Sequence, residues 1–174
     1  MKRLSIAVLG LLLAAGCSSS TSTTPSTTAA GNSTVRFTAA MSPSQETPAI
    51  TNGESVGSGT ATIDFNITRD ATGTITAASA NFAVNMSGFP STAVVNIAHI
   101  HTGATGVAGP ILVSTTVNPG EVVLTSGSGT FTRVGITMPA ATAQSIIDNP
   151  AGFYFNVHTA LNPGGVMRAQ LVKQ

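Results

Sequence analysis

Hydrophobic and polar residues alternate along most of the chain after residue 34. In residues 35–41 every second side chain is apolar, namely Val35, Phe37, Ala39 and Met41. The same period of two recurs in residues 60–67 and 80–86. Successive side chains of a strand point to opposite faces of a sheet, so this pattern predicts strands that are buried on one face. Ile75 and Ala77 are odd-numbered, whereas the alternating apolar residues of 80–86 are even-numbered. This change predicts a bulge or bend near Ala78.

Further strands are predicted in six later segments, at residues 96–101, 111–117, 122–124, 129–136, 153–159 and 166–172. Turns rich in Gly, Asn, Asp and Pro separate most of them. Between Pro139 and Pro150, Ala143, Ile146 and Ile147 recur at helical spacing, which predicts one short helix. Seven to nine short strands at this spacing predict an all-β fold, an antiparallel sandwich or barrel whose end is covered by the helix.

The first residues have the layout of an export signal. Lys2 and Arg3 precede an apolar stretch at residues 4–15, which is too short to span a bilayer because a spanning helix needs about 20 residues. The stretch ends in Leu13-Ala14-Ala15-Gly16-Cys17, which resembles a bacterial lipobox. The resemblance implies that Cys17 is lipidated and becomes the mature N-terminus; an ordinary signal peptide is the alternative. Ser18 after the cysteine favours the outer membrane if the cell is Gram-negative.

The segment after Cys17 has no apolar periodicity. Residues 18–28 are all Ser or Thr apart from Pro25, so they predict a flexible tether. The sequence therefore predicts a lipoprotein signal peptide at 1–16, a lipidated cysteine and tether at 17–34, and a β-sandwich domain at 35–174.

Charge is sparse. The chain has 7 Lys and Arg and 6 Asp and Glu, with a formal net charge of +1 and 42% hydrophobic residues. Removing residues 1–16 takes away Lys2 and Arg3, which leaves 5 basic against 6 acidic side chains and a net charge of −1. No basic face for nucleic acid is present, and the hydrophobic content excludes a disordered chain.

Three histidines carry the candidate chemistry. His99 and His101 are two residues apart on a predicted strand, so they point to one face, and His158 follows the apolar positions of another strand. If the two strands pair, the imidazoles form a cluster that copper or zinc would favour. Because neutral imidazole is the ligand, metal affinity should fall below about pH 6.5. The alternative is that the three side chains only hydrogen-bond loop backbone and one another. His158 would share its face with Tyr154 and Asn156, within reach of solvent or a loop.

The sequence offers little from which a catalytic site could be assembled. No carboxylate lies within a few residues of a histidine, and there is no Ser-x-x-Lys or nucleotide-binding glycine loop. Glu46 and Glu54 are interpreted as solvated or hydrogen-bonding loop residues. We therefore expect no enzyme activity and no required cofactor, with copper or zinc as the metal that the histidines would bind.

Several motifs resemble the chordin (CHRD) domain family. They are Gln45-Glu46-Thr47-Pro48, Gly57-Ser58-Gly59-Thr60-Ala61, Ala98-His99-Ile100-His101-Thr102-Gly103, Gly109-Pro110, Asn156-Val157-His158-Thr159, Asn162-Pro163-Gly164-Gly165, Arg168 and Gln170-Leu171. The resemblance implies a β-sandwich with a structural or binding motif formed by Asn156, Thr159, Asn162, Pro163, Gly164 and Arg168. Family members often carry an acidic residue and a second Gly around the Arg, which this chain lacks.

Two functions remain open at this level. One is a membrane-anchored envelope lipoprotein that acts as a binding or structural module, with an envelope protein or polysaccharide as its partner. The other is a copper- or zinc-binding envelope protein that uses His99, His101 and His158. The first follows from the lipobox, the tether and the low charge density, and the second follows from the histidine spacing.

Overall fold

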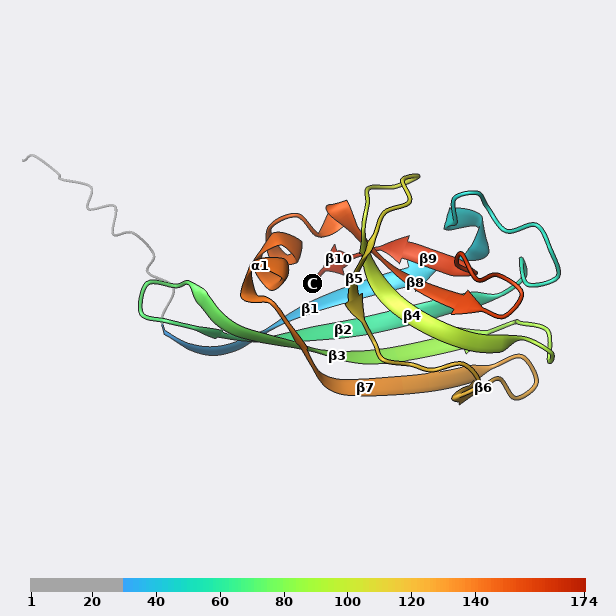
Figure 1. The fold of residues 1–174 in the computed structure, drawn as a ribbon, viewed down its shortest axis with the longest axis horizontal. Coiled ribbons are helices and arrows are strands. Elements are labelled where there is room, and N and C mark those ends of the chain that lie inside the picture. The colour runs from blue at the N-terminus through green and yellow to red at the C-terminus, as the bar shows by residue number, and fades with distance from the viewer. Residues whose placement is uncertain (1–29) are drawn as a thin grey trace, which may run out of the picture.

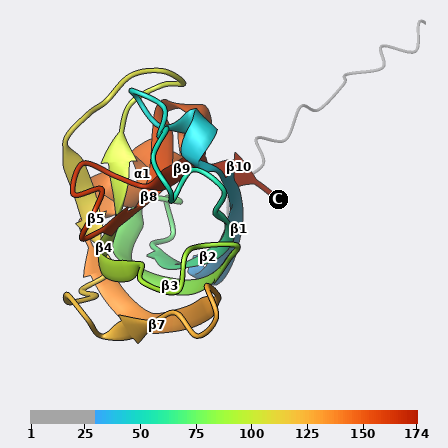
Figure 2. The same ribbon diagram turned by 90° about the vertical axis from the view of Figure 1, so that its right-hand side faces the viewer.

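The structure is a computed structural model that describes residues 30–174, in which two antiparallel sheets pack face to face. Sheet A has the order β10-β1-β2-β3-β7, and sheet B has the order β5-β4-β8-β9 with β6 paired to β4. Figure 2, turned by 90°, shows the two layers around a common core. The predicted all-β sandwich with one short helix is confirmed.

The strands of sheet A are β1 (Gly31–Met41), β2 (Ser58–Arg69), β3 (Ile75–Ser87), β7 (Gly129–Met138) and β10 (Val172–Lys173). Sheet B contains β4 (Val94–Thr102), β5 (Ile111–Ser114), β6 (Val122–Val123), β8 (Phe153–Thr159) and β9 (Met167–Gln170). β1 begins four residues before the predicted domain start, so residues 31–34 belong to a strand and not to the tether. The signal segment, Cys17 and the rest of the tether lie outside the described residues.

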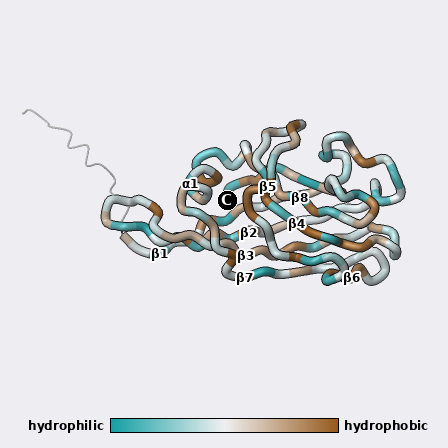
Figure 3. The backbone as a smooth tube through the Cα atoms, viewed as in Figure 1, coloured by the Kyte–Doolittle hydropathy of each residue, from teal (hydrophilic) through white to brown (hydrophobic). Residues whose placement is uncertain are grey.

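The core is formed by the inward-facing hydrophobic residues of the alternating strands. Figure 3 shows hydrophobic and hydrophilic segments following one another along the strands. Phe37 and Phe65 contact each other within sheet A, with ring centroids 4.9 Å apart. Phe82 of sheet A stacks on Phe155 of sheet B, with centroids 5.8 Å apart and planes 28° apart. Burial of these rings, each at most 2% exposed, joins the two sheets.

Helix α1 (Ala140–Asp148) closes one end of the sandwich (Figure 1). Pro139 precedes it, and Asn149 ends it before a 3-10 turn, η2 (Pro150–Gly152). The helix buries the three predicted residues Ala143, Ile146 and Ile147. Another 3-10 turn, η1 (Pro43–Gln45), lies in the loop between β1 and β2.

The strand boundaries and pairing differ in places from the simple alternating pattern. The predicted bulge near Ala78 is confirmed: Thr68 pairs with Ala77 while Arg69 pairs with Ile75, so Thr76 is the extra residue. Ala77 is therefore exposed and Ala78 buried. β5 is shorter than predicted and ends at Ser114.

The predicted strand at residues 166–172 is divided into β9 and β10, which lie in different sheets. Leu171, 2% exposed, lies between them and donates its backbone N–H to the carbonyl of Phe153. The alternating pattern continues through this crossing, so sequence periodicity alone does not reveal it.

Candidate metal centre

Strands β4 and β8 bring the three predicted histidines together. The two strands pair antiparallel, with His99 opposite Asn156, His101 opposite Tyr154, and Ile97 opposite His158. All three imidazoles lie on the face of sheet B that points away from the core. One ring nitrogen from each lies within 4.8 Å of one from each of the others.

The outward face of sheet B is covered by loops. Every residue of β8 is buried, and the three histidines are 5–7% exposed. The loop after β1 contributes Glu46, whose Oε1 accepts a hydrogen bond from Asn156 Nδ2 at 2.8 Å. This face is therefore a buried polar layer and not a solvated one.

Two of the histidines are held in one tautomer by backbone carbonyls. His101 Nδ1 donates to the Gly109 oxygen at 3.0 Å, and His158 Nδ1 donates to the Pro163 oxygen at 2.9 Å. A carbonyl oxygen only accepts, so each Nδ1 carries the hydrogen and each neutral ring presents a lone pair on Nε2. Histidines that bind metals are oriented by such bonds on the second nitrogen.

Two of the ring nitrogens face each other directly. His99 Nδ1 and His158 Nε2 are hydrogen-bond partners 3.4 Å apart. A tetrahedral zinc ion with Zn–N bonds of about 2.0–2.1 Å holds two ligating nitrogens about 3.4 Å apart. His101 Nε2 is buried and has no hydrogen-bond partner among the described residues. The cluster can supply three nitrogen ligands once His99 carries its proton on Nε2.

Burial keeps these imidazoles neutral. Desolvation lowers the pKa of His99 to about 4, helped by the neighbouring His158 and His101. Desolvation also lowers the pKa of His101 and of His158, against the carbonyl hydrogen bonds that raise it. At neutral pH all three rings are therefore in the form that binds metal, and protons compete less than the ordinary histidine pKa predicts.

An aromatic and cationic stack supports His101. The His101 ring stacks on Tyr154, with centroids 4.9 Å apart and planes 8° apart, and the Arg168 guanidinium lies 4.3 Å from the centre of the same tyrosine ring. Arg168 is 2% exposed and donates to the carbonyls of Gln45 and Val107 and to Thr47 Oγ1. The stack joins β9, β8 and the loop after β1 to the histidine cluster.

The two glutamates of that loop are buried, which corrects the interpretation of them as solvated. They do hydrogen-bond: Glu54 Oε2 accepts from Thr159 Oγ1 and from Asn162 Nδ2, both at 2.5 Å. Desolvation raises the pKa of Glu46 to about 7, although Arg168 and the Thr47 backbone N–H oppose the shift. A sequence gives no sign that carboxylates more than 100 residues from β8 lie against it, apart from their place in the family motif.

The predicted motif residues surround this layer. Asn156 binds Glu46, Thr159 and Asn162 bind Glu54, and Pro163 orients His158. Gly164 has open space around it, whereas the neighbouring Gly165 lies against Asn156 and Glu46 with φ at +129°. Tyr154 was expected on the face of His158 and Thr47 lies in a family motif, whereas Asn52, which donates to Asn162 Oδ1, was not named by sequence reasoning.

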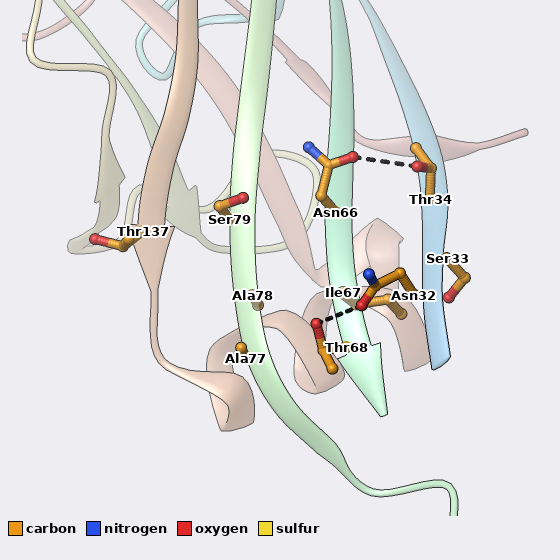
Figure 4. Close-up of a pocket in the computed structure, with 10 residues that line it drawn as sticks. All are labelled: Asn32, Ser33, Thr34, Asn66, Ile67, Thr68, Ala77, Ala78, Ser79 and Thr137. Carbon is orange, nitrogen blue, oxygen red and sulfur yellow. Dashed lines mark hydrogen bonds between the residues drawn. The ribbon is translucent and has the colours of Figure 1, made fainter. Parts of the chain in front are cut away.

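The outer face of sheet A is a second polar surface. Near one end of β1, β2 and β3 it holds a shallow hollow of about 510 Å³ (Figure 4), lined by Asn32, Ser33, Thr34, Asn66, Ile67, Thr68, Ala77, Ala78, Ser79 and Thr137. None of these residues is charged. Thr34 donates to Asn66 and Thr68 donates to Asn32, so neighbouring strands are linked by side chains across the hollow.

A comparison with known families agrees with the motifs. A family model described as the CHRD domain matches residues 37–171. No curated protein and no solved structure matches the chain. Within residues 30–174, no helix has both the length and the hydropathy needed to cross a bilayer.

Proposed function

The chain belongs to the CHRD domain family, and we propose that it is an exported, lipid-anchored envelope protein whose β-sandwich domain binds zinc or copper through His99, His101 and His158. The CHRD domain is not a known enzyme family, and we expect no catalytic activity. The anchor is Cys17, and the outer membrane is its expected location if the cell is Gram-negative.

One observation carries the metal proposal. Three buried imidazoles each place one ring nitrogen within 4.8 Å of the others, while backbone carbonyls hold the Nδ1 atoms of His101 and His158. A purely structural cluster would place its ring nitrogens against donors and acceptors of the protein, because a buried polar atom without a partner costs about 1–3 kcal/mol. His101 Nε2 has no such partner.

Metal titration tests the proposal. The full chain, purified in detergent and stripped with a chelator, is titrated with Zn²⁺ and with Cu²⁺ beside a variant in which all three histidines are Gln. The wild type should bind one equivalent and gain thermal stability from it, by about 2.7 kcal/mol at a free metal concentration of 100 Kd.

The histidine-free variant should bind at least about 100-fold more weakly, because no other histidine is present and the single cysteine, Cys17, is the proposed acylation site. Equal affinity of the two proteins, or destabilisation of the variant with no metal effect on the wild type, would show that the imidazoles are structural.

A second candidate function rests on the outer face of sheet A. Its hollow offers hydroxyl and amide groups without net charge, and the Arg36–Asp64 pair beyond it is mutually neutralised by two hydrogen bonds of 2.7 and 2.8 Å. Such a surface complements an uncharged, hydroxyl-rich polymer, so a neutral polysaccharide is the partner that it favours. Retention of the wild type on immobilised dextran, compared with Asn66→Asp, tests this: the added charge should reduce retention, and equal elution would oppose the idea.

A further inference from the structure

Two buried side-chain atoms of the described residues have no hydrogen-bond partner, His101 Nε2 and Asn156 Oδ1. Native proteins leave few such atoms, and each one calls for a ligand, a water or a strained role. Both belong to the outward face of sheet B. Asn156 pairs with His99 and lies on the same face of β8 as Tyr154 and His158.

One hydrogen bond and a close neighbour orient the Asn156 amide. Its Nδ2 donates to Glu46 Oε1, and a Cβ atom at Gly165 would come within 2.4 Å of the same nitrogen. With Nδ2 donating to Glu46, the buried Oδ1 has no partner of its own. Asn156 itself lies on the face of sheet B that carries the histidines.

We propose that the metal ion of the three-histidine centre carries a water molecule as its fourth ligand, and that this water donates a hydrogen bond to Asn156 Oδ1. The inference rests on the proposed metal function. A tetrahedral ion bound by three histidines has one further position, and among the described residues the cluster has no fourth His, Cys, Asp or Glu. The ion satisfies His101 Nε2, and its water satisfies Asn156 Oδ1.

The neighbouring side chains set the kind of ligand that can occupy this position. The site is buried, so only a small molecule fits. The Asn156 oxygen accepts a hydrogen bond from water but repels an anion that has no proton to donate. Water should therefore be favoured over azide, and Asn156 is a positioning residue for the exogenous ligand and not a ligand itself.

Cobalt spectroscopy tests this assignment. The full chain in detergent is loaded with Co²⁺, whose visible absorption reports its coordination, and is then titrated with azide. The wild type should show a saturable spectral change as azide replaces water.

Asn156→Ala removes the acceptor, so azide should bind about fivefold more tightly, the effect of one ordinary hydrogen bond. Asn156→Asp places a negative charge at the same position and should weaken azide binding. Asn118→Ala, in an exposed turn, is the control and should match the wild type.

The outcomes separate the two proposals. If Co²⁺ binds but azide leaves the spectrum unchanged, and X-ray absorption finds no oxygen ligand, the water assignment is wrong while the metal site stands. Identical azide affinity in the wild type, Asn156→Ala and Asn156→Asp would overturn the role of Asn156. If the wild type binds neither Co²⁺ nor Zn²⁺, the metal function itself fails.

Discussion

Gly165 shows how a single residue without a side chain permits the polar layer to form. A Cβ atom there would lie 2.4 Å from Asn156 Nδ2 and 2.7 Å from Glu46 Oε1, and φ is +129°. Gly164, its neighbour, has nothing within 4 Å of the same position. The requirement for glycine thus differs completely between two adjacent and chemically identical residues.

Gly165→Ala should destabilise the protein by about 2–4 kcal/mol, because it combines a strained backbone with a clash against two buried side chains. Gly164→Ala is the matched control and should be neutral or stabilise by about 0.4–1 kcal/mol, since it reduces the freedom of the unfolded chain. Urea unfolding of both variants measures this. Equal effects at the two positions would mean that the loop does not pack on β8 as described.

Glu46 gives the fold a pH dependence of known sign. Its pKa is raised from 4.5 to about 7 by burial, so the carboxyl is protonated in both states below pH 4.5. Between pH 4.5 and 7 the unfolded chain ionises first, so this contribution to stability is lost as the pH rises. The loss is at most about 3 kcal/mol, because one pKa unit corresponds to about 1.4 kcal/mol.

Glu46→Gln stays neutral and can still accept from Asn156, so it should be about as stable as the wild type at pH 4 and about 2 kcal/mol more stable at pH 8. Glu121→Gln is the control, and its effect on stability should depend on pH in the opposite direction. The Asn118 backbone N–H and Arg133 lower the pKa of Glu121. Urea unfolding at pH 4 and pH 8 measures the stability of each variant. If Glu46→Gln changed stability equally at both pH values, Glu46 would not titrate between them.

At the scale of elements, local signals and tertiary pairing agree except where a strand bulges or changes sheet. In β7 the pairing shifts between Ile136 and Arg133, and Gly135 there has φ at +72°. The residue next to it, Val134, is 78% exposed although it is apolar. A bulge changes which parity faces the core, and its exact position depends on pairing partners that are distant in sequence.

Helix α1 provides a test of how an end cap contributes to a β-sandwich. Ile146 is fully buried, whereas Ser145 is exposed on the other side of the helix. Ile146→Ala should cost about 2–5 kcal/mol through lost burial and a residual cavity. Ser145→Ala should change stability by less than about 0.5 kcal/mol. Denaturant unfolding compares them, and a small effect of Ile146→Ala would show that the helix is not part of the cooperative unit.

For the whole molecule, the anchor and the domain are separable predictions. The resemblance to a lipobox predicts that Cys17 is acylated, and residues 30–174 contain no cysteine. Acylation gives stable anchoring because each buried methylene contributes about 0.8 kcal/mol.

Cys17→Ser should abolish incorporation of labelled fatty acid, with Ser19→Ala as a control that remains labelled. Metabolic labelling followed by membrane fractionation provides the measurement. Continued labelling of the Cys17→Ser protein would refute lipidation at this residue and favour an ordinary signal peptide.

The all-β class, the helix between Pro139 and Pro150 and the two histidine-bearing strands could be predicted from the sequence, because these features depend on periodicity and on local backbone preferences. The proximity of His99 and His101 also followed from the period of a strand. These features require no knowledge of which segments meet in space.

The meeting of His158 with His99 and His101 could be seen only in the tertiary structure, because it depends on the register between β4 and β8. The tertiary structure also decided that the outward face of sheet B is buried, because the covering loop and the strand lie more than 100 residues apart along the chain. Desolvation follows from that cover, and with it the low pKa of His99 and the high pKa of Glu46. The residue types fix which atoms could bind a metal, and the packing of distant segments fixes their charge state and their direction.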